Sequence, residues 1–92
     1  MLNIKFTKLA VEDLNNGYDH IYSDNRSAAR DVIVRIRSTL DLLAVQPFIG
    51  HPGRVEGTYD FYVLNTPFIV VYILENDDLV VVSLLHTSRQ YP

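Results

Sequence analysis

The sequence predicts an α+β fold, in which an N-terminal strand precedes a two-helix hairpin that packs on a C-terminal three-stranded antiparallel meander. Up to residue 45, apolar residues recur every three or four positions, as they do on one face of a helix. After Pro47 they gather in short runs bounded by turn residues, as in strands. The connections between these runs are too short for a crossover, so neighbouring strands should be antiparallel. The 92 residues fit a single domain, 1–92.

The chain opens with a strand and a helix. Residues 2–6 alternate between apolar and polar, which predicts a half-buried strand. Thr7 can cap a helix over about 8–22, whose first turns carry two acidic residues near the positive helix N-terminus. The apolar face of this helix would consist of Ala10, Leu14, Tyr18 and Ile21.

The second helix has the clearest periodicity in the chain. Asp24, Asn25 or Ser27 can cap its start, and the pattern continues to about Val45. One stripe at three-four spacing forms its apolar face, with members Ala29, Val32, Ile33, Ile36, Leu40 and Leu43.

Three strands are expected after a loop over residues 46–58. They would cover Tyr59 to Asn65, Phe68 to Leu74 and Leu79 to Leu85, with turns at 65–67 and 75–78. The last two runs are apolar at nearly every position, yet two helices can cover only one face of the sheet. An apolar face left bare usually marks a protein interface, so the sequence predicts a stable protein partner or a homodimer.

Composition excludes several classes of function. A net charge of −3 argues against a protein that binds nucleic acid through many phosphate contacts. The absence of cysteine excludes disulfides, thiolate chemistry and cysteine-ligated zinc. Neither a signal-peptide pattern nor an apolar run of membrane-spanning length is present, so no membrane association is expected and the predicted compartment is the cytoplasm.

Four residues in the long loop and the C-terminal tail have side chains suited to phosphodiester cleavage: Arg54, His86, Arg89 and Tyr91. A histidine can move the proton of an attacking hydroxyl, arginines can hold the phosphate, and tyrosine can stack on a base. The alternative is structural: His86 ends a strand, Arg89 pairs with a carboxylate, and Tyr91 packs on the domain. Tyr59 and Tyr62 are likewise either core aromatics or contacts at an interface.

The three histidines do not predict a metal site. His20, His51 and His86 are far apart in the sequence and lack both a two-histidine helical spacing and adjacent acidic ligands. We therefore expect no metal and no other cofactor.

Three segments in order resemble the RelE/ParE superfamily of bacterial type II toxins. They are Gly50–Thr58 (GHPGRVEGT), Thr66–Tyr72 (TPFIVVY) and Leu85–Pro92 (LHTSRQYP). The resemblance implies two N-terminal helices against an antiparallel sheet. It also implies a cognate antitoxin whose disordered, amphipathic C-terminal part folds along the toxin, giving a possible hetero-oligomer.

The superfamily has two main activities: RelE-like members cleave messenger RNA in the ribosomal A site, and ParE-like members poison DNA gyrase. The RelE pattern has lysines where this chain reads Phe61–Leu64, and an arginine where Ile69 stands. Arg89 matches a RelE active-site arginine, but Tyr91 lies before the position of the RelE catalytic tyrosine. The resemblance therefore implies a ParE-like, non-enzymatic inhibitor of growth that acts on DNA gyrase.

The residues expected to contact the target or the antitoxin are Arg54, Tyr59, Tyr62, Arg89 and Tyr91. The alternative is a ribosome-dependent mRNA endoribonuclease, with the ribosome and mRNA as partners and Arg54, His86 and Arg89 as catalytic residues.

Overall fold

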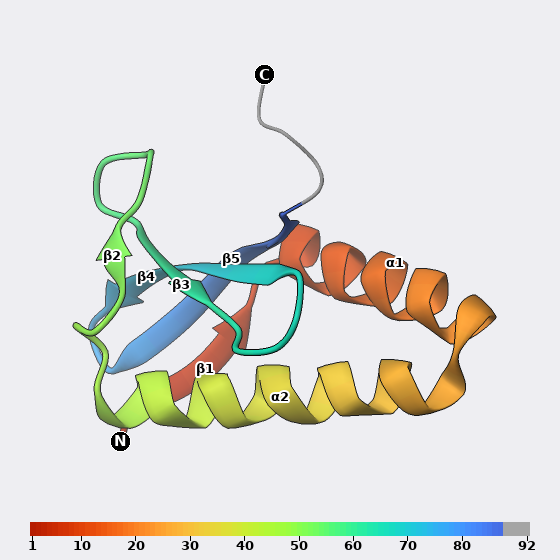
Figure 1. Ribbon diagram of the computed structural model, residues 1–92. Coiled ribbons are helices and arrows are strands. Elements are labelled where there is room, and N and C mark those ends of the chain that lie inside the picture. Colours follow the sequence, from red (N-terminus) through yellow and green to blue (C-terminus); the bar gives the residue numbers. More distant parts are fainter. Residues whose placement is uncertain (88–92) are drawn as a thin grey trace.

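The computed structural model describes residues 1–87 and confirms the predicted α+β class (Figure 1). The elements in order are β1 (Asn3–Phe6), α1 (Lys8–Asp24), α2 (Arg26–Val45), β2 (His51–Pro52), β3 (Tyr59–Tyr62), β4 (Phe68–Glu75) and β5 (Asp78–His86). The predicted helix pair and the antiparallel meander of the last three strands are both present.

All five strands form one sheet in the order β1-β5-β4-β3-β2. The N-terminal strand β1 lies parallel to β5 at one edge, and β2 is a two-residue strand in the loop that the sequence leaves irregular. The predicted strand Tyr59 to Asn65 is too long, because β3 ends at Tyr62 and the chain then turns. Asn65 has a φ of 59°, and the Thr66 N–H donates to the Val63 carbonyl (3.2 Å), so the ladder stops there.

Side-chain caps define both helices. Thr7 Oγ1 accepts a hydrogen bond from the Ala10 N–H (3.1 Å), and Asn25 Oδ1 accepts one from the Ala28 N–H (3.0 Å). Asn25 alone separates the helices, so α1 continues to Asp24 instead of ending near residue 22. Within residues 1–87, no helix combines the length and the apolar composition needed to cross a membrane.

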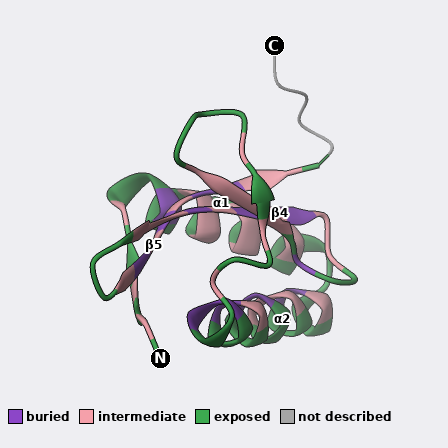
Figure 2. Ribbon diagram, turned by 90° about the vertical axis from the view of Figure 1, so that its left-hand side faces the viewer, coloured by how far each residue is buried: buried purple, intermediate pink, exposed green. Residues whose placement is uncertain are grey.

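Both helices cover the same face of the sheet, as the sequence predicts (Figure 2). The core between them consists of Ala10, Ile36, Leu40, Leu43, Val63, Phe68, Val70, Tyr72, Leu79, Val81 and Leu84. On the opposite face, side chains such as Ile69, Val71 and Val80 are half-buried. The face predicted to be bare is thus uncovered by helices, but neighbouring side chains on the sheet shield one another.

A bulge ties α1 to the end of the sheet. The β4–β5 register shifts between Val71 and Tyr72, which leaves Val82 as the extra residue of β5. Thr7 Oγ1 donates to the Val82 carbonyl (2.7 Å). The Leu84 N–H donates to an Asp13 carboxylate oxygen (3.1 Å), so α1 satisfies two backbone groups next to the bulge.

Candidate functional site

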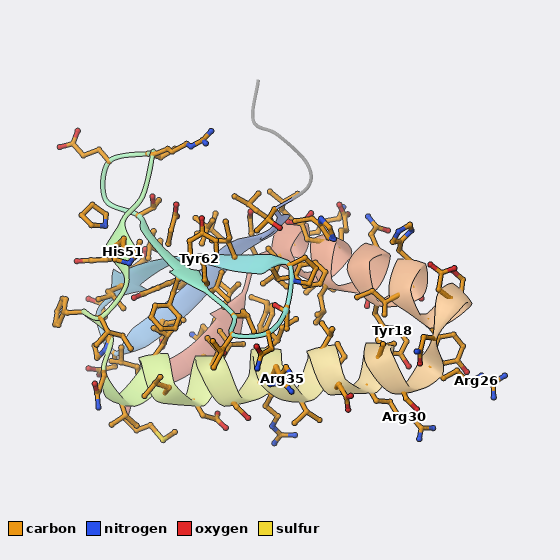
Figure 3. The ribbon with its side chains drawn as sticks, in the orientation of Figure 1. Tyr18, Arg26, Arg30, Arg35, His51 and Tyr62 are labelled. Carbon is orange, nitrogen blue, oxygen red and sulfur yellow. The ribbon has the colours of Figure 1, made fainter. Side chains whose placement is uncertain are left out.

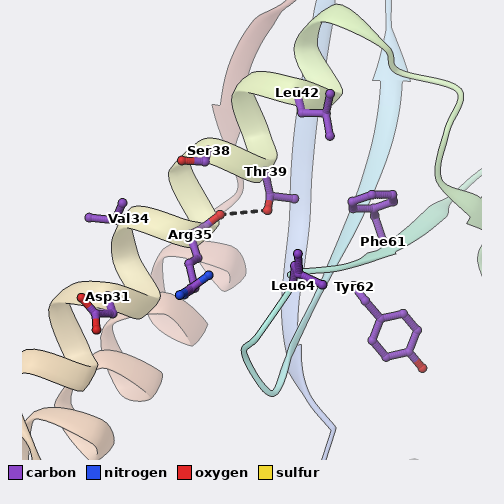
Figure 4. A pocket seen from close by; sticks show the side chains of 9 residues that line it. All are labelled: Asp31, Val34, Arg35, Ser38, Thr39, Leu42, Phe61, Tyr62 and Leu64. Carbon is purple, nitrogen blue, oxygen red and sulfur yellow. Dashed lines mark hydrogen bonds between the residues drawn. The ribbon is translucent and has the colours of Figure 1, made fainter.

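An open groove between α2 and β3, which we call the helix groove, has a volume of about 690 Å³ (Figure 4). It is lined by Asp31, Val34, Arg35, Ser38, Thr39, Leu42, Phe61, Tyr62 and Leu64. Four of its apolar or aromatic side chains are strongly exposed: Val34 (62%), Leu42 (43%), Tyr62 (61%) and Leu64 (76%). Exposed apolar side chains that gather in one groove are typical of a protein-binding surface.

One wall of the helix groove is a row of residues on α2. Val34, Ser38 and Leu42 are each four positions apart, so they form one ridge along the helix. The small Ser38 between two apolar residues allows close approach of a second backbone. This ridge is exposed because the adjacent stripe, which includes Ile36 and Leu40, is the one that packs on the sheet.

The other wall is formed by the end of β3 and the turn after it. Val63 is buried, and its N–H donates to the Phe68 carbonyl (2.9 Å), which anchors the chain as it leaves β3. The residues on either side of this anchor, Tyr62 and Leu64, remain exposed. Leu64 lies opposite α2, whereas the ring of Tyr62 points away from the helix (Figure 4). Phe61, which is half-buried, also lines the groove.

The chemistry of the helix groove is that of binding. Its charged side chains are Asp31 and Arg35, of opposite sign and both on α2 (Figure 4). The Thr39 hydroxyl donates a hydrogen bond to the Arg35 carbonyl of the same helix (2.8 Å). Its proton is therefore already used within α2. An apolar groove with a polar rim beside a helix suits an amphipathic helix from another chain. Within residues 1–87, no three histidine, aspartate or glutamate side chains are grouped to hold a metal ion.

The predicted site residues occupy different parts of the molecule. Tyr62 lines the rim of the helix groove. Tyr59 is half-buried and stacks on Tyr72, with ring centroids 5.3 Å apart, so its ring supports the core. His86 ends β5 and meets the Phe68 ring edge-on at 5.2 Å. Arg54 lies in the β2–β3 loop.

The strand register separates Arg54 from His86. His86 pairs with Phe68, near the Tyr62 end of β3, whereas the loop that carries Arg54 follows the pairing of Pro52 with Tyr59 at the other end. Arg89 and Tyr91 lie outside the described residues. The roles assigned to these residues stay predictions.

The fold perturbs the ionisation of Asp60 on β3. Burial raises the pKa of Asp60 above 3.8, and the positive charges of Arg54 and His51 oppose that rise. His51 lies on β2 (Figure 3). The folded state therefore binds the proton more tightly than the unfolded chain. The free energy of unfolding should accordingly fall as pH rises from about 3.8 through the raised pKa.

We expect Asp60→Asn to remove this part of the pH dependence, because asparagine keeps the shape and cannot ionise. Urea unfolding of both proteins between pH 3.5 and 7 measures it. The stability of the variant relative to the original should increase with pH across the window just above 3.8 and then level off. A difference that is constant across that window would show that burial does not perturb Asp60.

Sequence reasoning missed Val34, Leu42 and Leu64. The signal for the first two is that they lie on α2 outside its apolar stripe, where a charged or small polar residue would be ordinary. Their spacing of eight residues places them on one ridge, which indicates a second apolar surface on the same helix.

One family model matches nearly the whole chain. The family described as "ParE toxin of type II toxin-antitoxin system, parDE" matches residues 4–91. A "Putative toxin Y4kP" of Sinorhizobium fredii (strain NBRC 101917 / NGR234) is 30% identical over 89 residues, which cover 97% of this chain and 92% of that protein.

Solved structures show the same fold. A chain of the chromosomal ParDE TA system from P. aeruginosa is similar with a TM-score of 0.82 and 20% identity, covering 94% of this chain and 96% of that one. The solution structure of the conserved hypothetical protein HP0894 from Helicobacter pylori is similar with a TM-score of 0.60 and 21% identity, covering 96% and 97%.

Proposed function

This chain belongs to the ParE toxin family of type II toxin–antitoxin systems, and we propose that it arrests growth by poisoning DNA gyrase in the cytoplasm until a cognate antitoxin neutralises it. The single observation that carries the proposal is the family match over residues 4–91. It agrees with the resemblance implied by the Gly50–Thr58 and Thr66–Tyr72 segments.

The helix groove supports the antitoxin part of the proposal. An isolated small domain gains nothing from displaying Val34, Leu42 and Leu64 to water, whereas a partner helix would bury all three. A segment that is disordered alone and folds on binding would present apolar residues at three-four spacing to the Val34–Leu42 ridge. Tyr62, exposed at the rim of the groove, has the large rigid ring typical of an interface hot spot.

The gyrase target is favoured over ribonuclease activity because the described sheet lacks cationic side chains at the positions where RelE-like toxins have them. The four residues of β3 include no lysine, and their only charged residue is Asp60. The position that holds an arginine in RelE-like toxins is Ile69, half-buried on β4. A surface without these cations is poorly suited to bind a scissile phosphate and stabilise its developing charge.

Purified toxin in a gyrase supercoiling and DNA-cleavage assay tests the target. We expect supercoiling to be inhibited and cleaved DNA to accumulate. Arg54→Ala should weaken both effects about tenfold if this loop contacts the target, as for a typical interface arginine. Arg30→Ala, at an exposed position of α2 outside the helix groove, is the matched control.

Two results would overturn the target assignment. One is unchanged supercoiling with no trapped cleavage complex at toxin concentrations that exceed those of gyrase. The other is codon-phased cutting of messages in induced cells that disappears in His86→Ala, which would establish the ribonuclease alternative.

A further inference from the structure

The sheet has an open edge at β1. Within the described chain, β1 is one of the two edge strands and pairs with β5 alone. The Asn3 N–H donates to the Asp77 carbonyl (2.9 Å) and the Thr7 N–H to the Val81 carbonyl (3.0 Å). Because backbone groups alternate in direction along a strand, the N–H and C=O groups of Ile4 and Phe6 point away from β5. They are therefore positioned to pair with one more strand.

A second apolar groove, which we call the edge groove, opens beneath β1 with a volume of about 310 Å³. Its lining comes from β1, α1 and α2: Ile4, Phe6, Leu14, Ile33, Ile36, Arg37, Leu40 and Asp41. A strand added beside β1 would direct every second side chain, about 7 Å apart, toward this groove. The backbone edge and the groove thus fit the same ligand, which is an extended peptide with alternating apolar residues.

A second copy of this chain fits the edge poorly. In the antiparallel register that uses all the outward groups of both strands, Ile4 lies opposite Phe6 of the partner copy. Lys5 then faces its own counterpart directly, and like charges in that position are destabilising. Lys5 is exposed on the face opposite the edge groove, 3.1 Å from the Asp78 carboxylate. An acidic residue in the added strand would instead complement it.

We propose that a segment of the antitoxin with the pattern apolar–acidic–apolar adds to β1 as a sixth strand, its acidic residue opposite Lys5 and its apolar residues in the edge groove. The inference rests on the proposed function in one respect, the identity of the partner. One antitoxin chain can reach both grooves, because α2 alone separates them. An extended peptide that runs halfway around α2, a helix about 11 Å wide, needs on the order of five residues to connect the two grooves.

Amide hydrogen exchange tests the pairing directly. The probes are the purified cognate antitoxin and a synthetic Thr-Val-Glu-Val-Thr peptide, each mixed with isotope-labelled toxin. We expect exchange at Ile4 and Phe6 to slow at least tenfold in the antitoxin complex, while Thr7, already bonded to β5, changes little. The peptide should shift the same amide resonances, and a peptide with lysine in place of glutamate should bind several-fold more weakly.

Phe6→Pro provides a mutational test. Proline removes an N–H that points away from β5, and edge strands tolerate it there. We expect antitoxin affinity to fall at least tenfold, and less in Phe6→Ala, which keeps the N–H. Thermal unfolding of the free variants checks that they fold; if Phe6→Pro does not, the exchange experiment on the original chain decides alone.

The outcomes separate this inference from the proposed function. If the antitoxin binds and neutralises the toxin while Ile4 and Phe6 exchange as fast as in the free toxin, the sixth strand is wrong and the proposed function stands. If no antitoxin binds at all, the proposed function fails as well.

Discussion

Tyr72→Ala should lower the free energy of unfolding by about 3 to 5 kcal/mol, as expected when a large aromatic side chain is removed from a core. The side chain is fully buried at the centre of the sheet and stacks on Tyr59. Its hydroxyl donates to the Pro47 carbonyl (2.7 Å), which fixes the start of the long loop against the core. Since small domains have a total stability of only about 5 to 15 kcal/mol, urea unfolding should show a protein close to its stability limit.

Two further variants divide this loss into its parts. Tyr72→Phe keeps the ring and removes the hydrogen bond, so it should cost only about 1 to 2 kcal/mol. Gly50→Ala places a Cβ where it overlaps the Tyr72 hydroxyl, so it should be destabilising alone and partly rescued by Tyr72→Phe. Additive effects in this double-mutant cycle would show that Gly50 and Tyr72 do not approach as closely as the structure indicates.

The helices were predictable because the interactions that define them are local. The Thr7 and Asn25 caps lie three residues from the N–H groups they satisfy, and the α2 stripe repeats within a single helix. The β4–β5 hairpin was predictable for the same reason. Its turn at Asn76 and Asp77 joins two adjacent apolar runs, and Asn76 takes the positive φ (56°) that asparagine tolerates.

The pairing of β1 could not be derived from sequence. Its partners on β5 lie about 75 residues away, as in the contact of Ile4 with Leu79, and no local pattern specifies them. The bulge at Val82 could not be predicted either. Because both faces of β5 are apolar, a one-residue shift in strand register does not change the pattern of apolar and polar residues. The polar groups that stabilise it, Thr7 and Asp13, belong to the start of α1.

The exposed apolar groove lies elsewhere than on the sheet face that the sequence predicts to be bare. The expectation of an apolar surface for a partner came from the sheet face of Ile69 and Val71, which is half-buried, whereas several strongly exposed apolar side chains line the helix groove. The walls of that groove, Leu42 and Leu64 among them, are more than twenty residues apart in the chain. Each residue alone is an ordinary exposed apolar side chain, and only the fold brings them together.

The double variant Val34→Glu/Leu42→Glu should reduce antitoxin affinity at least a hundredfold. Both residues would be buried against the partner helix, and two carboxylates there would be left without partners in an apolar contact. Both positions are exposed in the free toxin and glutamate is a good helix former, so stability should change little. Calorimetric titration with the antitoxin measures the affinity, and growth of cells that co-express both proteins measures neutralisation.

The matched control for this variant is Leu9→Glu/Val11→Glu on α1. These residues are exposed to 53% and 44% and lie outside the helix groove, so the same charge change there should leave affinity unchanged. The groove variant should still arrest growth, now even when the antitoxin is present, because its own fold and its contacts with the target remain. Unchanged antitoxin affinity would exclude the helix groove as the antitoxin site. A groove variant that folds but no longer arrests growth would instead assign Val34 and Leu42 to contact with the target.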